Sequence, residues 1–214
     1  MDYIIHILPN MFSGLGVSAK IFVLTFVLAL PIGILLAMVR ISHVALFRKL
    51  AAIYIYVMRG TPLMLQIMFI YYGLPLMLHV QVSDFPAAIL AFVANYAAYI
   101  AEIYRGGIEA IPAGQYEAAK VLGYSKGQTF FRIVFPQVCK HILPAVTNEI
   151  ITLVKDTSLA FVLAVTEMFT MAKQIAAAQP SMVPYIAAGI FYYVFNLLVA
   201  MIMEKIEEKL NYYH

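Results

Sequence analysis

Charged residues are scarce in this sequence. Only 12% of its 214 residues are Asp, Glu, Lys or Arg, whereas soluble domains carry about 25%. Hydrophobic residues make up 64%, and the mean hydropathy is +0.88. Four long segments contain no charge at all: 21–39, 60–83, 85–101 and 174–203. A helix that crosses a bilayer needs about 20 mainly apolar residues, so these segments predict an integral membrane protein.

Other absences exclude whole classes of function. The single cysteine, Cys139, cannot form an internal disulfide, and the five histidines are scattered without the spacing of a metal site. The chain has no phosphate-binding loop, no serine-nucleophile motif and no zinc-protease motif. A net charge of +3 is too small to indicate nucleic-acid binding. We therefore expect a protein that is not an enzyme, holds no metal and has no ATPase site of its own.

The sequence also has no tryptophan and no basic segment at its N-terminus. Tryptophan is absent, so tyrosine, with 15 copies, has to supply any aromatic belt at the membrane surface. The N-terminus reads MDYIIHILPN and has no basic segment, so it does not resemble a cleaved secretory signal. We expect its first apolar run to remain as a membrane anchor.

The spacing of the charges predicts an all-helical bundle with five spans. The spans are placed at 14–39, 52–78, 86–105, 143–170 and 184–205. Residues 1–14 and 209–214 then lie outside the membrane at the two ends. The fourth span contains four charged residues and is the least regular, so it can instead be a broken or bundle-buried helix.

Basic residues predict the orientation of these spans. They gather in the first loop, the third loop and the tail: Arg40, Arg48, Lys49, Lys120, Lys126, Arg132, Lys140, Lys205 and Lys209. The second loop has no basic residue, and the fourth has only Lys173. Because short cytoplasmic loops carry an excess of Lys and Arg, the N-terminus is expected outside and the C-terminus in the cytoplasm.

The third loop, 106–142, is longer than a simple connection needs. Pro112 and the residues after it predict a short helix over 115–122 that ends at Gly123. Ser125 and Gln128 have the spacing of a capping box for a second short helix, which Pro136 is expected to end. The alternative is an interfacial amphipathic loop.

Ionisable and amide side chains inside the predicted spans are the candidates for a polar path, because each is costly in hydrocarbon. In the second span, Pro62 removes a helical hydrogen bond, and Thr61 is available to satisfy the freed carbonyl. Six residues are selected for the path: Arg59, Gln66, Asn95, Glu102, Asp156 and Ser158. Arginine suits a substrate carboxylate, and the acids suit an ammonium.

Helical spacing groups these residues into stripes. Asn95, Tyr99 and Glu102 follow an i, i+4, i+7 pattern, and Arg105 and Glu109 continue it as a ladder of opposite charges. Four purely structural interpretations stay open. Arg59 can extend to the membrane surface, Glu102 can form an ion pair with Arg105, and the amides can join helices by hydrogen bonds. In the fourth span, the Lys155 and Asp156 charges can offset each other or pair across a homodimer interface.

The third loop resembles a known signature. Glu117-Ala118-Ala119, then Gly123, then Ile133 to Pro136 match the spacing of the EAA motif of permease subunits in bacterial ATP-binding-cassette importers. Phe135 stands where that motif usually has Leu. Further segments are similar to the polar amino-acid branch of those permeases: 59–63, 96–102, Arg105, 114–115 and 155–159.

The resemblance covers residues 15–208 and implies a transporter complex of several subunits. It implies the type I importer permease fold, with five spans and coupling helices, in a bacterial inner membrane. The expected partners are two ATPase subunits that bind ATP and Mg, a second permease copy or homologue, an extracellular solute-binding protein and an amino acid. The residues expected to couple the chain to the ATPase are Gln115, Glu117, Ala118, Ala119 and Gly123. Alternatives from other classes are an ion-driven secondary transporter and a membrane scaffold subunit.

Overall fold

The computed structural model describes residues 2–210, with side chains from His6 onward. Every regular element in this part of the chain is helical, which confirms the predicted all-helical class. The elements are α1 (Asp2–Arg40), α2 (Ala45–Gly60), α3 (Leu63–Met68), η1 (Phe69–Gly73), α4 (Leu74–Leu78), α5 (Asp84–Glu109), α6 (Ala113–Val121), α7 (Lys126–Thr129), η2 (Phe130–Val134), α8 (Phe135–Asp156), η3 (Thr157–Leu163), α9 (Met168–Ala178) and α10 (Val183–Leu210). Positions 211–214 of the predicted tail lie outside the described residues.

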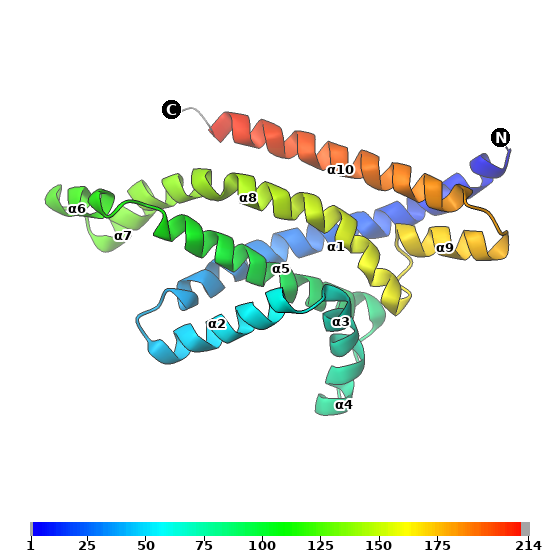
Figure 1. The fold of residues 1–214 in the computed structure, drawn as a ribbon, viewed down its shortest axis with the longest axis horizontal. Coiled ribbons are helices and arrows are strands. Elements are labelled where there is room, and N and C mark those ends of the chain that lie inside the picture. Colours follow the sequence, from blue (N-terminus) through cyan, green and yellow to red (C-terminus); the bar gives the residue numbers. More distant parts are fainter. Residues whose placement is uncertain (1, 211–214) are drawn as a thin grey trace.

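The long helices α1, α5, α8 and α10 run along the long axis of the molecule (Figure 1). The short helices α6 and α7 lie at one end, while α9 and the first turns of α1 and α10 lie at the other. Helix α5 is the most buried of the long helices, because small residues such as Ala91, Ala97 and Ala101 let its neighbours approach closely. It therefore carries the side chains that meet α1, α2, α3 and α8.

Three helices are long and apolar enough to cross a membrane: His6–Arg40, Asp84–Glu109 and Val183–Leu210. They contain the predicted spans 14–39, 86–105 and 184–205. Helix α1 begins earlier than predicted, so residues 2–13 are not a separate segment. Ile7 and Met11 are buried in one cluster with residues of α9 and α10, and this packing extends the helix.

The predicted second span, 52–78, is not one helix. Helix α2 and the segment Leu63–Leu78 meet at an angle of 111°. Thr61 and Pro62 both have extended backbone angles, and Pro62 cannot donate the hydrogen bond that would continue α2. The second segment, α3 to α4, therefore projects from the bundle as an arm at the bottom of Figure 1.

The predicted fourth span, 143–170, is also interrupted, which matches the broken helix left open above. Helix α8 begins at Phe135 and ends at Asp156, and a tighter helical turn, η3, follows it. The chain then reverses at Ala164, which has a left-handed backbone with φ of 56°. Helix α9 starts after this reversal.

The third loop contains the two predicted short helices. Gly123 has φ of +80° and ends the first, α6, as predicted. Its cap is completed by the Tyr124 N–H, which donates to the Ala119 carbonyl at 3.0 Å. The capping box of Ser125 and Gln128 at the start of α7 is confirmed.

The prediction that Pro136 ends the second short helix is wrong. The chain continues through η2 into α8 without a break. The wider turn of η2 joins the Phe135 N–H to the Phe130 carbonyl, and the Gln137 side chain donates to the Ile133 carbonyl at 2.7 Å. These bonds satisfy backbone groups around the proline, so the helix survives it.

Two adjacent glycines of α5 test its close packing against α8. A Cβ on Gly107 would lie 2.2 Å from Ile142 Cγ2, whereas one on Gly106 would meet nothing within 4 Å. We expect Gly107→Ala to lower the free energy of unfolding by about 1–3 kcal/mol through overpacking. Gly106→Ala, the matched control, is expected to raise it by about 0.5–1 kcal/mol. Thermal unfolding of the purified protein measures both, and equal effects would contradict this packing.

Candidate functional site

The bend between α2 and α3 is held by side-chain amides. Because Pro62 has no N–H, the Met58 carbonyl loses its helical partner. Gln66 Nε2 donates to this oxygen at 2.9 Å, and Asn95 Nδ2, from α5, donates to it at 3.0 Å. Asn95 Nδ2 also donates to Gln66 Oε1 at 2.9 Å. The two amides replace the missing hydrogen bond and fasten the bend to α5.

Thr61 completes this bend network but does not satisfy the carbonyl predicted for it. Its hydroxyl donates to the Val57 carbonyl at 2.8 Å, one residue before Met58. The same hydroxyl oxygen accepts a bond from Gln66 Nε2 at 2.8 Å. The sequence interpretation of Thr61 was therefore wrong in detail, because the Gln66 and Asn95 amides reach the freed oxygen instead.

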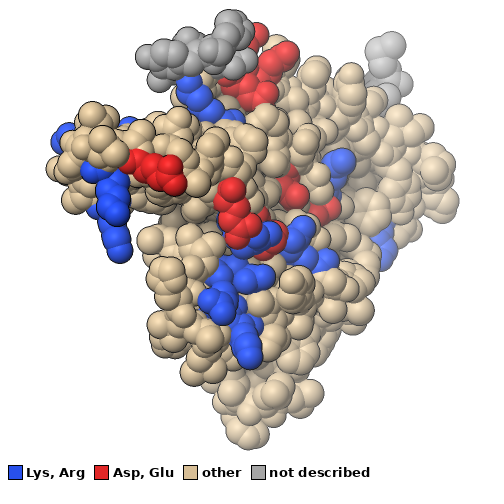
Figure 2. Space-filling view, turned by 60° about the vertical axis from the view of Figure 1, so that its left-hand side comes forward, with Lys and Arg blue, Asp and Glu red and all other residues tan. Residues whose placement is uncertain are grey.

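The C-terminal half of α5 forms the predicted charge ladder. Arg105 pairs with both Glu102 and Glu109, and its Nε lies 2.8 Å from Glu102 Oε1. Arg59, at the end of α2, lies over the Tyr99 ring at 5.2 Å from its centre. Figure 2 shows charged side chains gathered in the middle of this face and near the α6–α7 end, whereas the arm at the bottom is uncharged. The charges thus meet where α2, α5 and α8 come together.

Helix α8 contributes an acidic stripe to the same region. Tyr96, on α5, donates its hydroxyl proton to Asp156 Oδ2 at 2.8 Å. Glu149 lies on the same face of α8 as Asp156, and Arg59 interacts electrostatically with Glu149 as well as with Glu102. Asp156 stays half-buried while Tyr96 is buried, so one Asp156 oxygen is held and the group remains accessible.

The six predicted path residues therefore fall into three sets. Gln66 and Asn95 are buried and bonded to backbone at the bend. Arg59 and Glu102 lie near Tyr99 and Arg105. Asp156 is fixed by Tyr96, whereas the nearby Ser158 donates to the Lys155 carbonyl at the end of α8, 2.8 Å away.

A second buried polar network was not predicted. Glu167 is fully buried at the start of α9, where it accepts bonds from the Phe169 and Thr170 N–H groups, both at 2.7 Å. The Tyr192 hydroxyl, on α10, donates to it at 2.8 Å, and Ser18, on α1, accepts from the Met168 N–H at 3.2 Å. The network joins α1, α9 and α10. The only sign of this network in the sequence is Glu167 itself, an isolated acid in an apolar stretch. Nothing in the sequence marks its partners on α1 and α10.

The residues of the EAA-like segment form an elbow at the α6–α7 end. Glu117 and Ala118 are exposed on α6, and the apolar Val121 and Leu122 beside them are 87% and 72% exposed. Ala119 is buried inside the chain. Gln115 accepts a bond from Gln137 Nε2 of α8 at 3.4 Å, so α6 is linked to α8 by a side chain as well as by the backbone.

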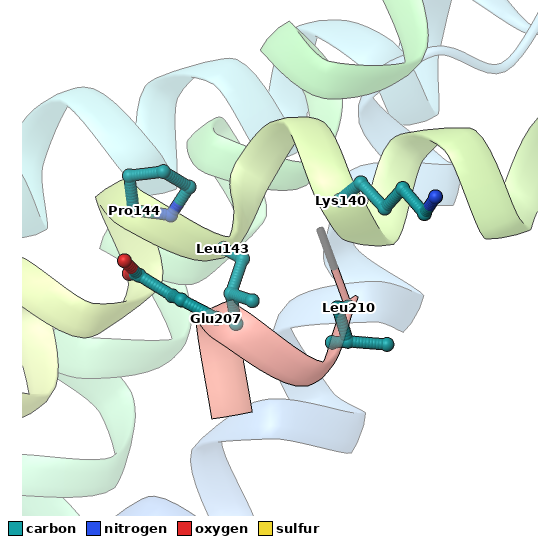
Figure 3. Close-up of a pocket in the computed structure, with 5 residues that line it drawn as sticks. All are labelled: Lys140, Leu143, Pro144, Glu207 and Leu210. Atoms are coloured by element: carbon teal, nitrogen blue, oxygen red, sulfur yellow. The ribbon is translucent and has the colours of Figure 1, made fainter. Parts of the chain in front are cut away.

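A small pocket between α8 and α10 lies apart from these groups. It has a volume of about 120 Å³ and is lined by Lys140, Leu143, Pro144, Glu207 and Leu210. Figure 3 shows Lys140 and Glu207 extending in different directions from it. Glu207 Oε1 accepts from the Thr147 hydroxyl at 2.7 Å. The pocket does not bring several polar groups onto one ligand, and no metal-binding group of three His, Cys, Asp or Glu occurs among the described residues.

Comparison with known proteins places the chain in a family. Residues 29–212 match the model of the binding-protein-dependent transport system inner membrane component. The chain belongs to this family. The arginine transport system permease protein ArtQ of Bacillus subtilis is 40% identical over 95% of this chain and 94% of its own length. The L-cystine transport system permease protein TcyB of the same organism is 33% identical over 96% of this chain and 88% of its own.

A solved structure agrees with this family membership. The permease-family chain superimposes on a chain of an amino acid ABC transporter crystallised with histidines, with a TM-score of 0.89. The two are 31% identical, and the match covers 97% of each. The resemblance seen in the sequence, to permeases of polar amino-acid importers, is thereby confirmed at the level of family and fold.

The amide network at the bend gives a testable coupling. We expect Gln66→Leu and Asn95→Leu each to lower the free energy of unfolding of the purified permease by about 0.6–1.7 kcal/mol. Because both amides donate to the Met58 carbonyl, the double variant should lose less than the sum. Gln174→Leu, an exposed amide on α9, is the control. Additive losses in thermal unfolding would show that the two amides act independently.

Proposed function

We propose that this chain is the membrane-spanning permease subunit of an ATP-driven amino-acid importer. The single observation that carries the proposal is the exposed α6 elbow, in which Glu117 and Ala118 lie on the surface of the described chain beside the exposed Val121 and Leu122. Its EAA-like sequence and the amino-acid permeases among the relatives support it. The elbow is the coupling site, and the polar groups between α2, α5 and α8 line the path.

We propose five membrane crossings in a bacterial inner membrane, with the second bent and the fourth broken. The α6–α7 end faces the cytoplasm, and the N-terminus faces outward, in line with the basic residues of loops one and three. Two permease copies or homologues, two ATPase subunits and an extracellular solute-binding protein complete the importer. ATP and Mg bind to the ATPase subunits, where hydrolysis takes place.

Coupling follows from how the elbow is joined to the bundle. Glu117 and Ala118 offer a charge and a close approach to the ATPase, with Val121 and Leu122 as exposed apolar contacts. Ala119 supports the elbow from inside, since it is buried in the chain. The chain from α7 to α8 is continuously helical, so a displacement of the elbow is transmitted to the acidic stripe of α8.

The proposed path uses Arg59, Glu102, Asp156 and Ser158. The half-buried Asp156 attracts an ammonium or a cationic side chain, and Arg59 attracts a carboxylate. Glu102 is partly neutralised by Arg105, so its influence on a passing substrate is smaller than that of Asp156. Gln66 and Asn95, which were selected with these residues, hold the bend beside the path.

Reversing the elbow charge tests the coupling site. Glu117→Arg is expected to abolish ATP-dependent uptake in reconstituted vesicles, because the changed residue faces the ATPase. Membrane insertion and thermal unfolding should be unchanged, since Glu117 is exposed. Glu208→Arg, an exposed acid at the same end of the molecule, is the control and should transport normally. Uptake at the wild-type rate by Glu117→Arg would remove the coupling proposal.

Neutralising the acids tests the path. Asp156→Asn can still accept the Tyr96 hydroxyl but loses its charge, so arginine should compete about tenfold less well for uptake, while glutamine and cystine change little. Glu102→Gln should have a smaller effect. Tyr96→Phe, which keeps the Asp156 charge, should preserve the order of the three amino acids. Unchanged selectivity in Asp156→Asn would count against this path.

A further inference from the structure

A hollow of about 270 Å³ lies between α1, the start of α5 and the segment that follows η3. Lys20 from α1 and Asp84 from α5 line it, and both are exposed. Thr166 adds a hydroxyl, while Val17 and Phe85 are less exposed and provide apolar surface. At about 30 Å³ for each water, the hollow has room for a small organic molecule.

The two charged residues share one depth in the bundle. At about 1.5 Å of rise per residue, Lys20 lies about 30 Å along α1 from Arg40, and Asp84 lies about 32 Å along α5 from Arg105. The hydrocarbon core is about 30 Å thick. If Arg40 and Arg105 mark one edge of the core, then Lys20 and Asp84 mark the other. The hollow is therefore at the membrane surface opposite the α6 elbow.

The opposite charges face the hollow without pairing with each other. No ion pair within 4 Å joins Lys20 to Asp84, so their charged atoms are further apart than that. Asp84 Oδ1 accepts a bond from the Phe85 N–H at 2.8 Å, and no hydrogen bond among the described residues engages Oδ2. The ammonium of Lys20 and a carboxylate oxygen of Asp84 are thus available on the rim.

The segment after η3 is shaped to complete this rim. Ala164 takes the left-handed backbone conformation, which costs about 1 kcal/mol for a residue with a side chain. The reversal that it makes buries Val165 and leaves Thr166 exposed beside the hollow. Strained positions of this kind persist where the surrounding structure holds them, and they are common at ligand sites.

We propose that this hollow is an entry site for the zwitterionic main-chain group of an amino acid. The substrate carboxylate pairs with Lys20, its ammonium pairs with Asp84, and its side chain lies over Val17 and Phe85. The inference rests on the proposed transport function and adds a second position to it, about one membrane thickness from the inner charge ladder. A zwitterionic lipid headgroup has the same two charges, so the test separates the two sources.

The absence of tryptophan in the chain makes a local reporter possible. Phe85→Trp places an indole in the wall of the hollow, in the permease purified with its ATPase in lipid nanodiscs of phosphatidylglycerol, without nucleotide or binding protein. The same complex with Phe85 supplies the background. The probes are arginine, argininamide, which lacks the carboxylate, and Nα-acetylarginine, which lacks the ammonium. We expect arginine to change the fluorescence at a concentration at least tenfold lower than either derivative.

Two variants assign the charges. Lys20→Met should remove the preference for arginine over argininamide but keep that over Nα-acetylarginine, and Asp84→Asn should do the reverse. Lys173→Met, which removes an exposed cation from α9, is the control and should keep both preferences. If Lys20 and Asp84 had a merely structural role, both variants would weaken the binding of all three probes equally. That result, or no fluorescence response to any probe, would overturn the proposal.

Replacing phosphatidylglycerol with phosphatidylethanolamine tests the lipid alternative. Arginine binding should be unchanged; loss of the arginine response in these discs would assign the hollow to a lipid headgroup and overturn the proposal. Uptake by the complete importer separates this inference from the proposed function. If the importer shows ATP-dependent uptake but amino acids do not change the fluorescence of the hollow, the entry site alone is overturned. If amino acids change the fluorescence but no ATP-dependent uptake occurs, the importer proposal is overturned.

Discussion

The carbonyl oxygen of Met58 is the constraint on which the arrangement of α2, α3 and α5 depends. In hydrocarbon no water is present to bond an unpaired backbone oxygen, so a proline in a span needs replacement donors from the protein. Gln66 and Asn95 supply them, and their bonds fix the 111° bend and attach it to α5. Helix α5 is consequently held on one side by α2 and α3, and its Tyr96 hydroxyl bonds Asp156 of α8.

The polar groups of the bundle fall into two sets according to their partners. Gln66, Asn95 and Glu167 form their hydrogen bonds with groups inside the protein, at two places where a helix is interrupted. Arg59 and Asp156 are less enclosed, so part of their hydrogen-bonding groups remains accessible. Buried networks of the first kind make rigid bodies, whereas accessible charges between helices can exchange partners with a substrate. A transporter needs both, because its rigid parts have to move around a path that stays polar.

The sequence predicted the helical class, the positions of three spans, the cap at Gly123 and the capping box at Ser125, because each depends on local spacing. It also predicted the Arg105 ladder, since i+3 and i+4 neighbours on one helix meet by geometry alone. It missed whatever depends on contacts between distant segments. The partners of Met58 O come from α3 and α5, the Asp156 partner Tyr96 is 60 residues away, and the Glu167 network draws on three helices. The survival of α8 through Pro136 depends on a wider turn that composition does not reveal.

In the proposed importer, an exposed elbow at one end of this bundle connects a polar path to an ATPase that is a separate protein. A cysteine in place of Ala118, with the native Cys139 replaced by Ser, tests it most directly by crosslinking in the native membrane. We expect one main product, with a nucleotide-hydrolysing subunit, whose yield changes when ATP is added. Crosslinks that reach only lipid or the helices of the chain itself would contradict it.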